Sequence, residues 1–518
     1  MGSEYRSRHQ LKSAQKEIPE ESSLRILDTF KKALKIAELY RVSGRFEDQA
    51  LFNTLLEGGY VEPGASGTLT RGKVEILPTG RNFFATDPRA IPTKAAWEVG
   101  RKTCELMIRR IYDELGKYPE TVGEVLWSID AYKADGEQLA QILCLIGARP
   151  IWDEASGRVL GVELIPLKEL GRPRIDVIVR ISGIVRDTLP SYVYLIDEAI
   201  EKAILVNEPE DMNYVKKHYI KYLEKLAKMG MNPGEASELA KVRVWGGSPG
   251  TYGAGVNLAI FASAWRNEKD LAMTWVHWAA YAYTRRIWGI RSVQTLAEQL
   301  KSVEAIARHH ISDEHDLTNC CCYFAFQGGF HVAAKTISGK EPINLWVDTR
   351  DAFRVSIRTT KEELIRVSYS KLLNTMWVEE MKRSGYRGAY EFMKKIQNLY
   401  GWHATTRFVP DEIWNNIAKK YVVELKDWFL ENNRYALEEI ARRLLEMHKR
   451  GLWKAPKELI EEIEKIHMEI EHLLEGEVSG EAQMSEVWVV TQDDIKEWSS
   501  KMDDVIKVFK EVESEKHE

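Results

Sequence analysis

Several features that would define a common class of protein are scarce in this sequence. Only five cysteines occur in 518 residues and three of them are adjacent, which argues against a framework of disulfide bonds. The net charge of −5 provides no basic surplus of the kind that binds nucleic acid. No apolar run is long enough to span a bilayer, and the polar N-terminus lacks the apolar segment of a signal peptide. We therefore expect a cytoplasmic protein with no membrane span and no nucleic-acid partner.

Alternating strand-like and helix-like segments predict an α/β fold. Strands are predicted at 122–129, 175–181 and 241–245, and helices at 136–146 and 192–205. Such alternation favours a parallel sheet with right-handed crossovers, whose carboxyl edge is the expected ligand side. Beyond residue 256 the pattern is mostly helical, with a helix at 296–309 and one strand at 343–347. We expect a parallel-sheet α/β body with a predominantly helical C-terminal region.

The same pattern divides the chain into five segments. They are a disordered lead-in (1–22), a helical segment with a PTGRN loop (23–120), an α/β domain (121–240), a glycine-turn and helical domain (241–475), and a linker with a C-terminal helix (476–518). The last helix carries an apolar stripe of Ile495, Trp498, Met502, Val505 and Phe509. Docking of this stripe on the protein itself is favoured over binding to a partner.

The most informative stretch is KVRVWGGSPGTYGAG at 241–255, where a strand-like run enters a turn with five glycines. Glycine allows positive φ and brings bare backbone close to a ligand, and the first N–H groups of the next helix favour an anion. We expect this turn to bind an anionic group of a ligand. The alternative is a tight loop that binds nothing.

This turn and six further segments resemble the large subunits of cobaltochelatase and magnesium chelatase, in the order of that family. The six are LPTGRNFFATDPRAIPTKAAWEVG (77–100), GARPIWDEASGRVLGVELIPLKELGRPRIDVIVRISG (147–183), GKEPINLWVDTRD (339–351), SGYRGAYEF (384–392), GWHAT (401–405) and ARRLLEMHKRGLW (441–453). The resemblance implies insertion of a divalent metal ion into a tetrapyrrole, such as a porphyrin or a precursor in cobalamin biosynthesis. It favours cobalt over magnesium as the metal substrate.

Members of this family carry a large N-terminal half before the PTGRN region, so the resemblance covers their C-terminal half only. It implies that a separate polypeptide supplies the N-terminal half, or that this protein does not need one. It also implies that AAA+ subunits hydrolyse the ATP, which agrees with the lack of a Walker A motif in this chain. ATP would then act only through partner subunits.

Metal insertion requires apolar walls for the tetrapyrrole ring, arginines for its carboxylates, and groups that accept the pyrrole protons. Within the resembling segments, substrate binding is assigned to Arg81, Asn82, Arg243, Gly250, Tyr252, Gly253 and Gly255. We expect Arg243 to converge with the glycine turn on an anionic group of the substrate.

Candidates for acid/base and metal chemistry concentrate in HHISDEHD at 309–316. If the predicted helix continues through this run, residues four apart share a face. Catalysis is assigned to Glu314, His315 and Asp316, which match an acidic element of the family. Metal binding is assigned to His309, His310, Glu314 and His315. The alternative is a solvated, charged end of a helix.

The same region also departs from the family. Carboxylates are commonly found in the family at the positions of Asn319, Cys321 and Cys322, a histidine at Gln327 and an aspartate at His403. These substitutions favour the alternative of a non-catalytic tetrapyrrole- or metal-binding paralogue, such as a carrier or accessory subunit. Thiols in place of carboxylates predict a preference for cobalt or zinc over magnesium. Because adjacent side chains diverge, the three cysteines are not expected to bind one ion together.

Overall fold

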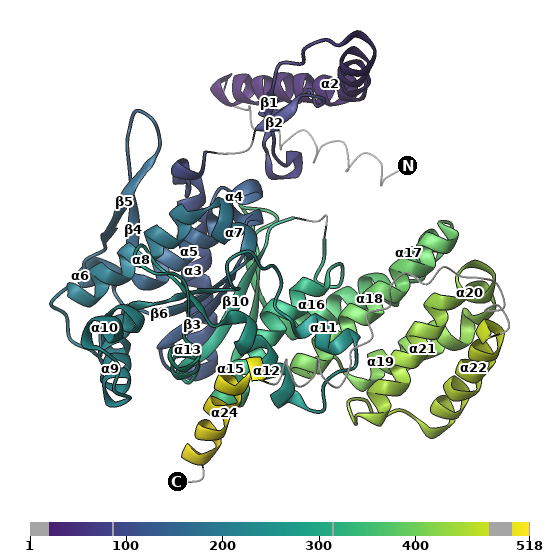
Figure 1. The fold of residues 1–518 in the computed structure, drawn as a ribbon. Coiled ribbons are helices and arrows are strands. Elements are labelled where there is room, and N and C mark those ends of the chain that lie inside the picture. Colours follow the sequence, from purple (N-terminus) through teal and green to yellow (C-terminus); the bar gives the residue numbers. More distant parts are fainter. Residues whose placement is uncertain (1–19, 85–86, 313–314, 476–499, 517–518) are drawn as a thin grey trace, which may run out of the picture. The chain divides into compact units, whose positions relative to one another are not determined.

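The computed structural model describes residues 20–84, 87–312, 315–475 and 500–516, and the chain forms two compact units (Figure 1). The first unit, Met1–Thr86, contains helix α2 (Glu20–Glu57) and two short paired strands, β1 (Gly64–Ala65) and β2 (Asn82–Phe84). Most of the predicted lead-in lies outside the described residues, and its last three residues are already helical.

The second unit, Asp87–Glu518, is built on an eight-stranded sheet with the order β12-β11-β10-β3-β6-β7-β8-β9. The five central strands are parallel: β11 (Ile343–Asp348), β10 (Val303–His310), β3 (Thr121–Leu126), β6 (Asp176–Ile181) and β7 (Val244–Gly246). The antiparallel strands are β12 (Ser356–Thr359), β8 (Tyr281–Tyr283) and β9 (Trp288–Arg291). The predicted parallel-sheet α/β body is confirmed.

The order of the parallel strands defines a doubly wound sheet. The chain adds β6 and β7 on one side of β3, and then adds β10 and β11 on the other side. The reversal falls between β3 and β10, and ligands of open α/β sheets bind outside the carboxyl ends of the strands at such a point.

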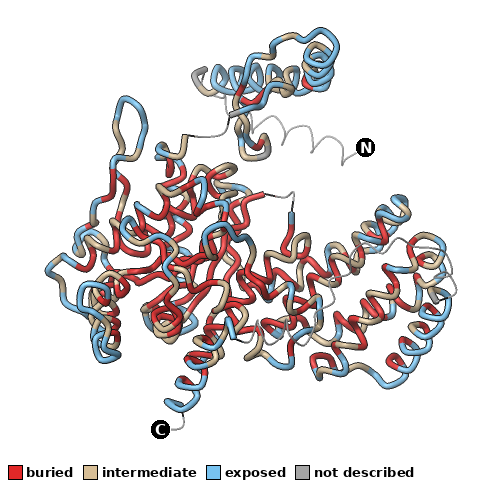
Figure 2. The backbone as a smooth tube through the Cα atoms, viewed as in Figure 1, coloured by how far each residue is buried: buried red, intermediate tan, exposed pale blue. Residues whose placement is uncertain are grey.

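Helices cover both faces of the sheet, which explains why its strands are apolar without alternation. Helices α3 (Lys94–Leu115), α5 (Glu137–Ile146) and α8 (Pro190–Leu205) pack on one face, and α12 (Glu268–Ala279), α13 (Val293–Leu300) and α15 (Gly329–Ser338) on the other. Val177 and Val179 of β6 join the first core, and Ile178 between them joins the second. Figure 2 shows the sheet as the most continuously buried part of this unit.

The predicted helical C-terminal region is confirmed. It contains α16 (Thr360–Val367), α17 (Thr375–Lys382), α18 (Gly385–Thr406), α19 (Asp411–Ala418), α20 (Lys426–Asn432), α21 (Arg434–Lys449) and α22 (Lys457–Glu475). The predicted boundary at residue 240 does not separate two domains, because β7, β10 and β11 share one sheet with β3 and β6. None of the described helices has both the length and the apolar character needed to cross a membrane.

The predicted helix at 296–309 is wrong in its second half. Helix α13 ends at Leu300, the N–H of Ser302 closes a turn on the carbonyl of Gln299, and strand β10 begins at Val303. The spacing of the apolar residues fits a helix, but VEAIARHH also fits a strand. The sheet decides between them because β3 and β11 pair with this segment from both sides.

The C-terminal helix α24 (Asp503–Glu515) docks on the protein itself, as predicted. Val505, Val508, Phe509 and Val512 are buried against α12 and α13. Asp504 also pairs with Arg291 at 2.9 Å. Ile495 and Trp498 of the predicted stripe lie outside the described residues.

Candidate functional site at the carboxyl edge of the sheet

The predicted strand, glycine turn and helix are present at the carboxyl end of β7. The turn follows Gly246, and α11 (Val256–Phe261) begins after Gly255. Gly250, Gly253 and Gly255 have φ values of 79°, 106° and 75°, which residues with a side chain rarely adopt. A Cβ atom on Gly255 would lie 2.3 Å from the indole nitrogen of Trp278, so only glycine fits there.

Arg186, which follows β6, organises this turn. Its Nη1 donates hydrogen bonds to the carbonyls of Ser248 at 2.6 Å and Thr251 at 3.1 Å. Tyr252 remains 61% exposed, and its hydroxyl donates to Asp187 at 2.7 Å. The turn thus presents an exposed aromatic ring at the sheet edge while a guanidinium holds its backbone.

Arg243 does not converge with the glycine turn, and the prediction that it does is wrong. Arg243 precedes the first residue of β7, whereas the turn follows the last, so the strand separates them. Its Nε donates to Asp176 at 2.7 Å and its Nη1 to the carbonyls of Ala240 and Val242, all within the core. Arg243 is therefore a buried structural residue at the opposite edge of the sheet.

Arg81 and Asn82 belong to the first unit, and the glycine turn belongs to the second. The side-chain nitrogen of Asn82 donates to the carbonyls of Ala65 at 2.7 Å and Ile76 at 3.1 Å, which closes its own loop. Their role in substrate binding stays a prediction.

Arg308 of β10 lies among aromatic rings at the switch point. Its guanidinium carbon is 3.6 Å from the ring centroid of Trp127, which follows β3, and 4.0 Å from that of Tyr323. Burial lowers the pKa of Arg308 to about 10. Within the described part of the chain no carboxylate pairs with Arg308, and its Nη1 has no hydrogen-bond partner.

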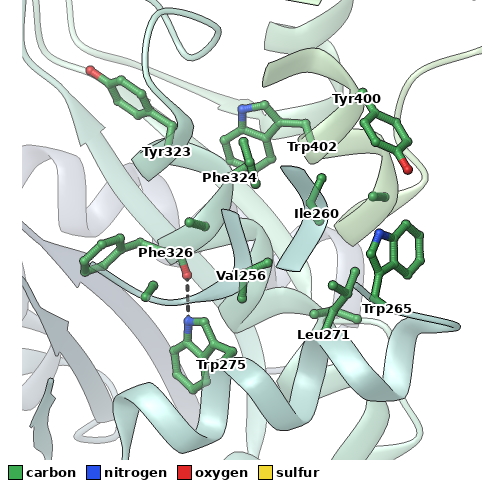
Figure 3. Packing of buried hydrophobic residues seen from close by; sticks show 14 of the residues in the cluster. Val256, Ile260, Trp265, Leu271, Trp275, Tyr323, Phe324, Phe326, Tyr400 and Trp402 are labelled. Atoms are coloured by element: carbon green, nitrogen blue, oxygen red, sulfur yellow. Dashed lines mark hydrogen bonds between the residues drawn. The ribbon is translucent and has the colours of Figure 1, made fainter. Parts of the chain in front are cut away.

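Arg180 of β6 repeats this arrangement. Its guanidinium carbon is 4.8 Å from the ring centroid of Phe326, and its Nη2 donates to the carbonyl of Gly253 in the glycine turn at 3.2 Å. Burial lowers the pKa of Arg180 to about 9, and none of the described carboxylates pairs with it. Figure 3 shows Tyr323 and Phe326 within the packed core, where Trp275 donates to the carbonyl of Phe326 at 3.1 Å.

A buried acid lies beside the same switch point. Both oxygens of Glu124 in β3 accept hydrogen bonds at 2.8 Å, one from Gln138 and the other from Gln141. Burial raises the pKa of Glu124 to about 8, so it is largely protonated at neutral pH. The amide oxygen of Gln141 lies 3.0 Å from Nε2 of His309. Hydrogen bonds through Gln141 therefore connect the protonated side chain of Glu124 to His309.

The two histidines of β10 do not converge on one ion. Adjacent residues of a strand point to opposite faces. His309 faces Gln141 on α5, whereas the ring of His310 is 5.3 Å from that of Trp346, and its Nε2 is 3.2 Å from the carbonyl of His315. Their joint assignment as metal ligands rested on a helix that is not present.

The catalytic assignment at 314–316 changes in the structure. Glu314 lies outside the described residues, and the side chain of His315 is exposed. Asp316 is buried and forms ion pairs with Lys371 at 2.5 Å and Lys395 at 2.9 Å. Burial alone would raise the pKa of Asp316, but the two ammonium groups outweigh it and hold this pKa well below its usual range. Two ammonium groups therefore hold Asp316 as a carboxylate, and its role in catalysis stays a prediction.

The three adjacent cysteines converge, against expectation. Their sulfur atoms all lie within 4.8 Å of one another, and all three residues are partly buried. Cys320 is extended, with φ −137° and ψ 135°, whereas helix α14 (Cys321–Tyr323) begins at the next residue. This change of backbone direction brings together side chains that would diverge in a regular strand. Hydrogen bonds from the thiols of Cys321 and Cys322 lower the pKa of Cys320.

Two other departures from the family pattern are structural here. Gln327 is buried in a π-helical turn and donates to Asn344 at 2.7 Å and to the carbonyl of Leu345 at 3.0 Å. His403 is buried, which lowers its pKa to about 4, and its Nε2 lies 2.7 Å from the carbonyl of Leu452. Both side chains are therefore held in place by hydrogen bonds within the protein.

Sequence reasoning missed the residues that the fold gathers at the switch point. Trp127, Arg180 and Arg308 lie on one face of the sheet there, and Glu124 and Gln141 lie on the other. A usable signal was present, because Glu124, Arg180 and Arg308 each interrupt an apolar strand. Buried strands seldom carry charged residues without a reason.

Fold and site together define a doubly wound α/β protein. Aromatic rings and two buried arginines lie where such sheets bind ligands, and no described carboxylate pairs with either arginine. The chain belongs to the CobN/magnesium chelatase family, whose model matches residues 4–460.

Individual relatives agree with this family. An uncharacterised protein of Methanocaldococcus jannaschii is 44% identical over 86% of this chain, and aerobic cobaltochelatase subunit CobN of a Sinorhizobium species is 37% identical over 78%. The chloroplastic magnesium-chelatase subunit ChlH of Oryza sativa subsp. indica is 35% identical over 81%. These alignments cover 36%, 32% and 30% of the relatives, so the chain spans about a third of their length.

A solved structure shares the fold. The catalytic subunit of cobaltochelatase from Mycobacterium tuberculosis matches with a TM-score of 0.76 and 31% sequence identity. The match covers 88% of this chain and 41% of that chain.

Proposed function

We propose that this protein binds a tetrapyrrole at the carboxyl edge of its sheet and takes part in inserting a divalent metal ion, cobalt in preference to magnesium. The observation that supports this most is the pair of buried arginines, Arg180 and Arg308, that lack a carboxylate partner among the described residues. A tetrapyrrole supplies carboxylates and a flat apolar ring. The exposed ring of Tyr252 and the partly buried ring of Trp127 provide aromatic surface for it.

In this proposal the proton acceptor moves from the predicted acidic run to His309, and the hydrogen bonds through Gln141 to Glu124 hold this imidazole in place. Metal insertion releases the inner pyrrole protons, which a neutral imidazole can accept. Gln141 holds Nε2 of His309 at 3.0 Å and connects it to the buried carboxyl group. His309 is a positioned candidate for this step, and AAA+ partner subunits in the cytoplasm would supply ATP hydrolysis. A separate polypeptide would supply the N-terminal half found in the relatives.

A second candidate is a tetrapyrrole carrier or accessory subunit without insertion activity. The ion pairs of Asp316 with Lys371 and Lys395 favour it, because they remove a carboxylate from the predicted chemistry. Both candidates require tetrapyrrole binding, so binding is the first property to measure.

The test is a titration of the purified full chain with deuteroporphyrin IX, followed by the porphyrin absorption band. We expect saturable binding that weakens about tenfold in Tyr252→Ala and in Trp127→Ala, since one aromatic contact contributes about 1 to 1.5 kcal/mol. Tyr435→Ala is the matched control, because Tyr435 is 59% exposed and lies on α21, away from the sheet.

Unchanged affinity in both site variants, or no porphyrin binding at all, would overturn the proposed site. Insertion is then assayed with Co²⁺ and with Mg²⁺ in the presence of ATP and AAA+ chelatase subunits. Binding without insertion of either metal would establish the carrier function instead.

A further inference from the structure

We propose that Cys320, Cys321 and Cys322 form a three-thiolate site for one thiophilic divalent metal ion. The proposal rests on the geometry of the thiols and their neighbours and does not depend on tetrapyrrole binding.

The distances between the sulfur atoms suit a single ion. A zinc ion holds thiolate sulfur at about 2.3 Å, which places sulfurs about 3.8 Å apart in a tetrahedral site. The three sulfurs lie within 4.8 Å of one another before any ion is considered. Small side-chain rotations close the remaining gap, since the change from extended to helical backbone already directs the three side chains together.

The surroundings balance the charge of such a site. Three thiolates and one divalent ion carry a net charge of −1. The guanidinium carbon of Arg308 lies 4.0 Å from the ring centroid of Tyr323, the residue that directly follows the three cysteines. The rings of Trp127 and Tyr323 hold this guanidinium, so a positive charge is fixed next to the cysteine segment.

Neighbouring groups also orient the sulfurs. Nδ2 of Asn257, on α11, donates to the sulfur of Cys321 at 3.6 Å. The backbone N–H of Cys322 donates to the sulfur of Cys320 at 3.4 Å. Donors of this kind stabilise thiolate ligands and hold them in place. The partial exposure of all three cysteines leaves a fourth coordination position open, as in zinc sites that exchange ligands.

The experiment uses Co²⁺ as an optical probe with the reduced, metal-free full chain under anaerobic conditions. We expect one Co²⁺ per chain, with the intense near-ultraviolet absorption of thiolate bound to cobalt, and displacement of Co²⁺ by Zn²⁺. Each single Cys→Ser variant should lose part of this absorption and bind at least about tenfold more weakly. Asn257→Ala should weaken binding while the absorption pattern is kept.

Controls separate this site from other thiols and from folding defects. Cys104 and Cys144 are buried on the other core, so Cys104→Ala and Cys144→Ala should leave Co²⁺ binding unchanged. In the unmodified chain, bound Zn²⁺ should slow alkylation of the three site cysteines by iodoacetamide, which mass spectrometry detects without any substitution. Co²⁺ absorption without a thiolate band, or equal alkylation with and without Zn²⁺, would overturn the site.

Porphyrin titrations in parallel distinguish this inference from the proposed function. Loss of Co²⁺ binding in the Cys→Ser variants with porphyrin binding intact supports the thiolate site and leaves the proposed function standing. A chain that binds Co²⁺ through thiolates but binds no porphyrin overturns the proposed function alone.

Discussion

The amino and carboxyl edges of the central sheet, where its parallel strands begin and end, differ in how their buried charges are paired. At the amino edge, Asp176 accepts from Arg243 at 2.7 Å and lies 2.9 Å from Nδ1 of His218, whose other nitrogen is 3.1 Å from Glu120. At the carboxyl edge, Arg180 and Arg308 are just as buried, but no described carboxylate pairs with them. Burying an unpaired charge is costly, so a fold retains one where another anion completes the pair. The comparison separates an amino edge whose buried charges are paired within the protein from a carboxyl edge whose buried arginines have no described carboxylate, and this difference is the basis of the proposed ligand site.

The largest expected loss of stability follows from removing the anion at the amino edge. Asp176→Asn leaves the guanidinium of Arg243 buried without its anion, and we expect a loss of about 3 to 5 kcal/mol in the free energy of unfolding. Arg308→Met at the other edge leaves no described carboxylate unpaired, so we expect less than half of that loss. Urea unfolding of both variants measures the difference. Equal losses would show that the two edges do not differ as proposed.

A second effect tests the comparison through pH. Burial raises the pKa of Glu124 from 4.5 to about 8, so the unfolded chain releases this proton at lower pH than the folded protein. The stability that Glu124 contributes is therefore complete below about pH 4.5 and falls as the pH rises toward 8, by up to about 1.4 kcal/mol per pH unit. Glu124→Gln imitates the neutral acid and should flatten this slope. Urea unfolding from about pH 5 to pH 8 measures it, and parallel slopes in the two proteins would contradict the buried neutral acid.

The smallest effect concerns the glycine turn at the carboxyl edge. Gly250→Ala meets no atom within 4 Å and should cost only about 1 to 2 kcal/mol, because φ is 79° there. Gly255→Ala adds the contact with Trp278 at 2.3 Å and should cost clearly more. If the turn binds substrate, Gly250→Ala should weaken porphyrin binding in a stable protein. Thermal unfolding of both variants measures these two costs, and porphyrin titration measures their binding. A Gly250→Ala variant that is less stable than Gly255→Ala would contradict the prediction.

Much of the fold was predictable because local pattern and tertiary structure agree over most of the chain. The strand at 175–181, the helix at 136–146 and the strand, turn and helix around 241–261 all recur in the structure. The segment 303–310 shows the limit of this approach. Its apolar spacing suited a helix, and only pairing with β3 and β11 made it a strand. That one change moved His309 and His310 to opposite faces.

The sequence by itself determined the family, the α/β class, the position of the glycine turn and the unusual run of three cysteines. Only the tertiary structure decided which of these residues act together. Arg243 is next to the glycine turn in sequence but at the opposite sheet edge, because a strand carries the chain from one edge to the other. Arg180 of β6 and Arg308 of β10 are distant in sequence and lie on one face of the sheet, because parallel strands align side by side, whereas Glu124 of β3 faces α5 on the other face. Sequence patterns report neighbours along the chain, and a site is made of neighbours across the sheet.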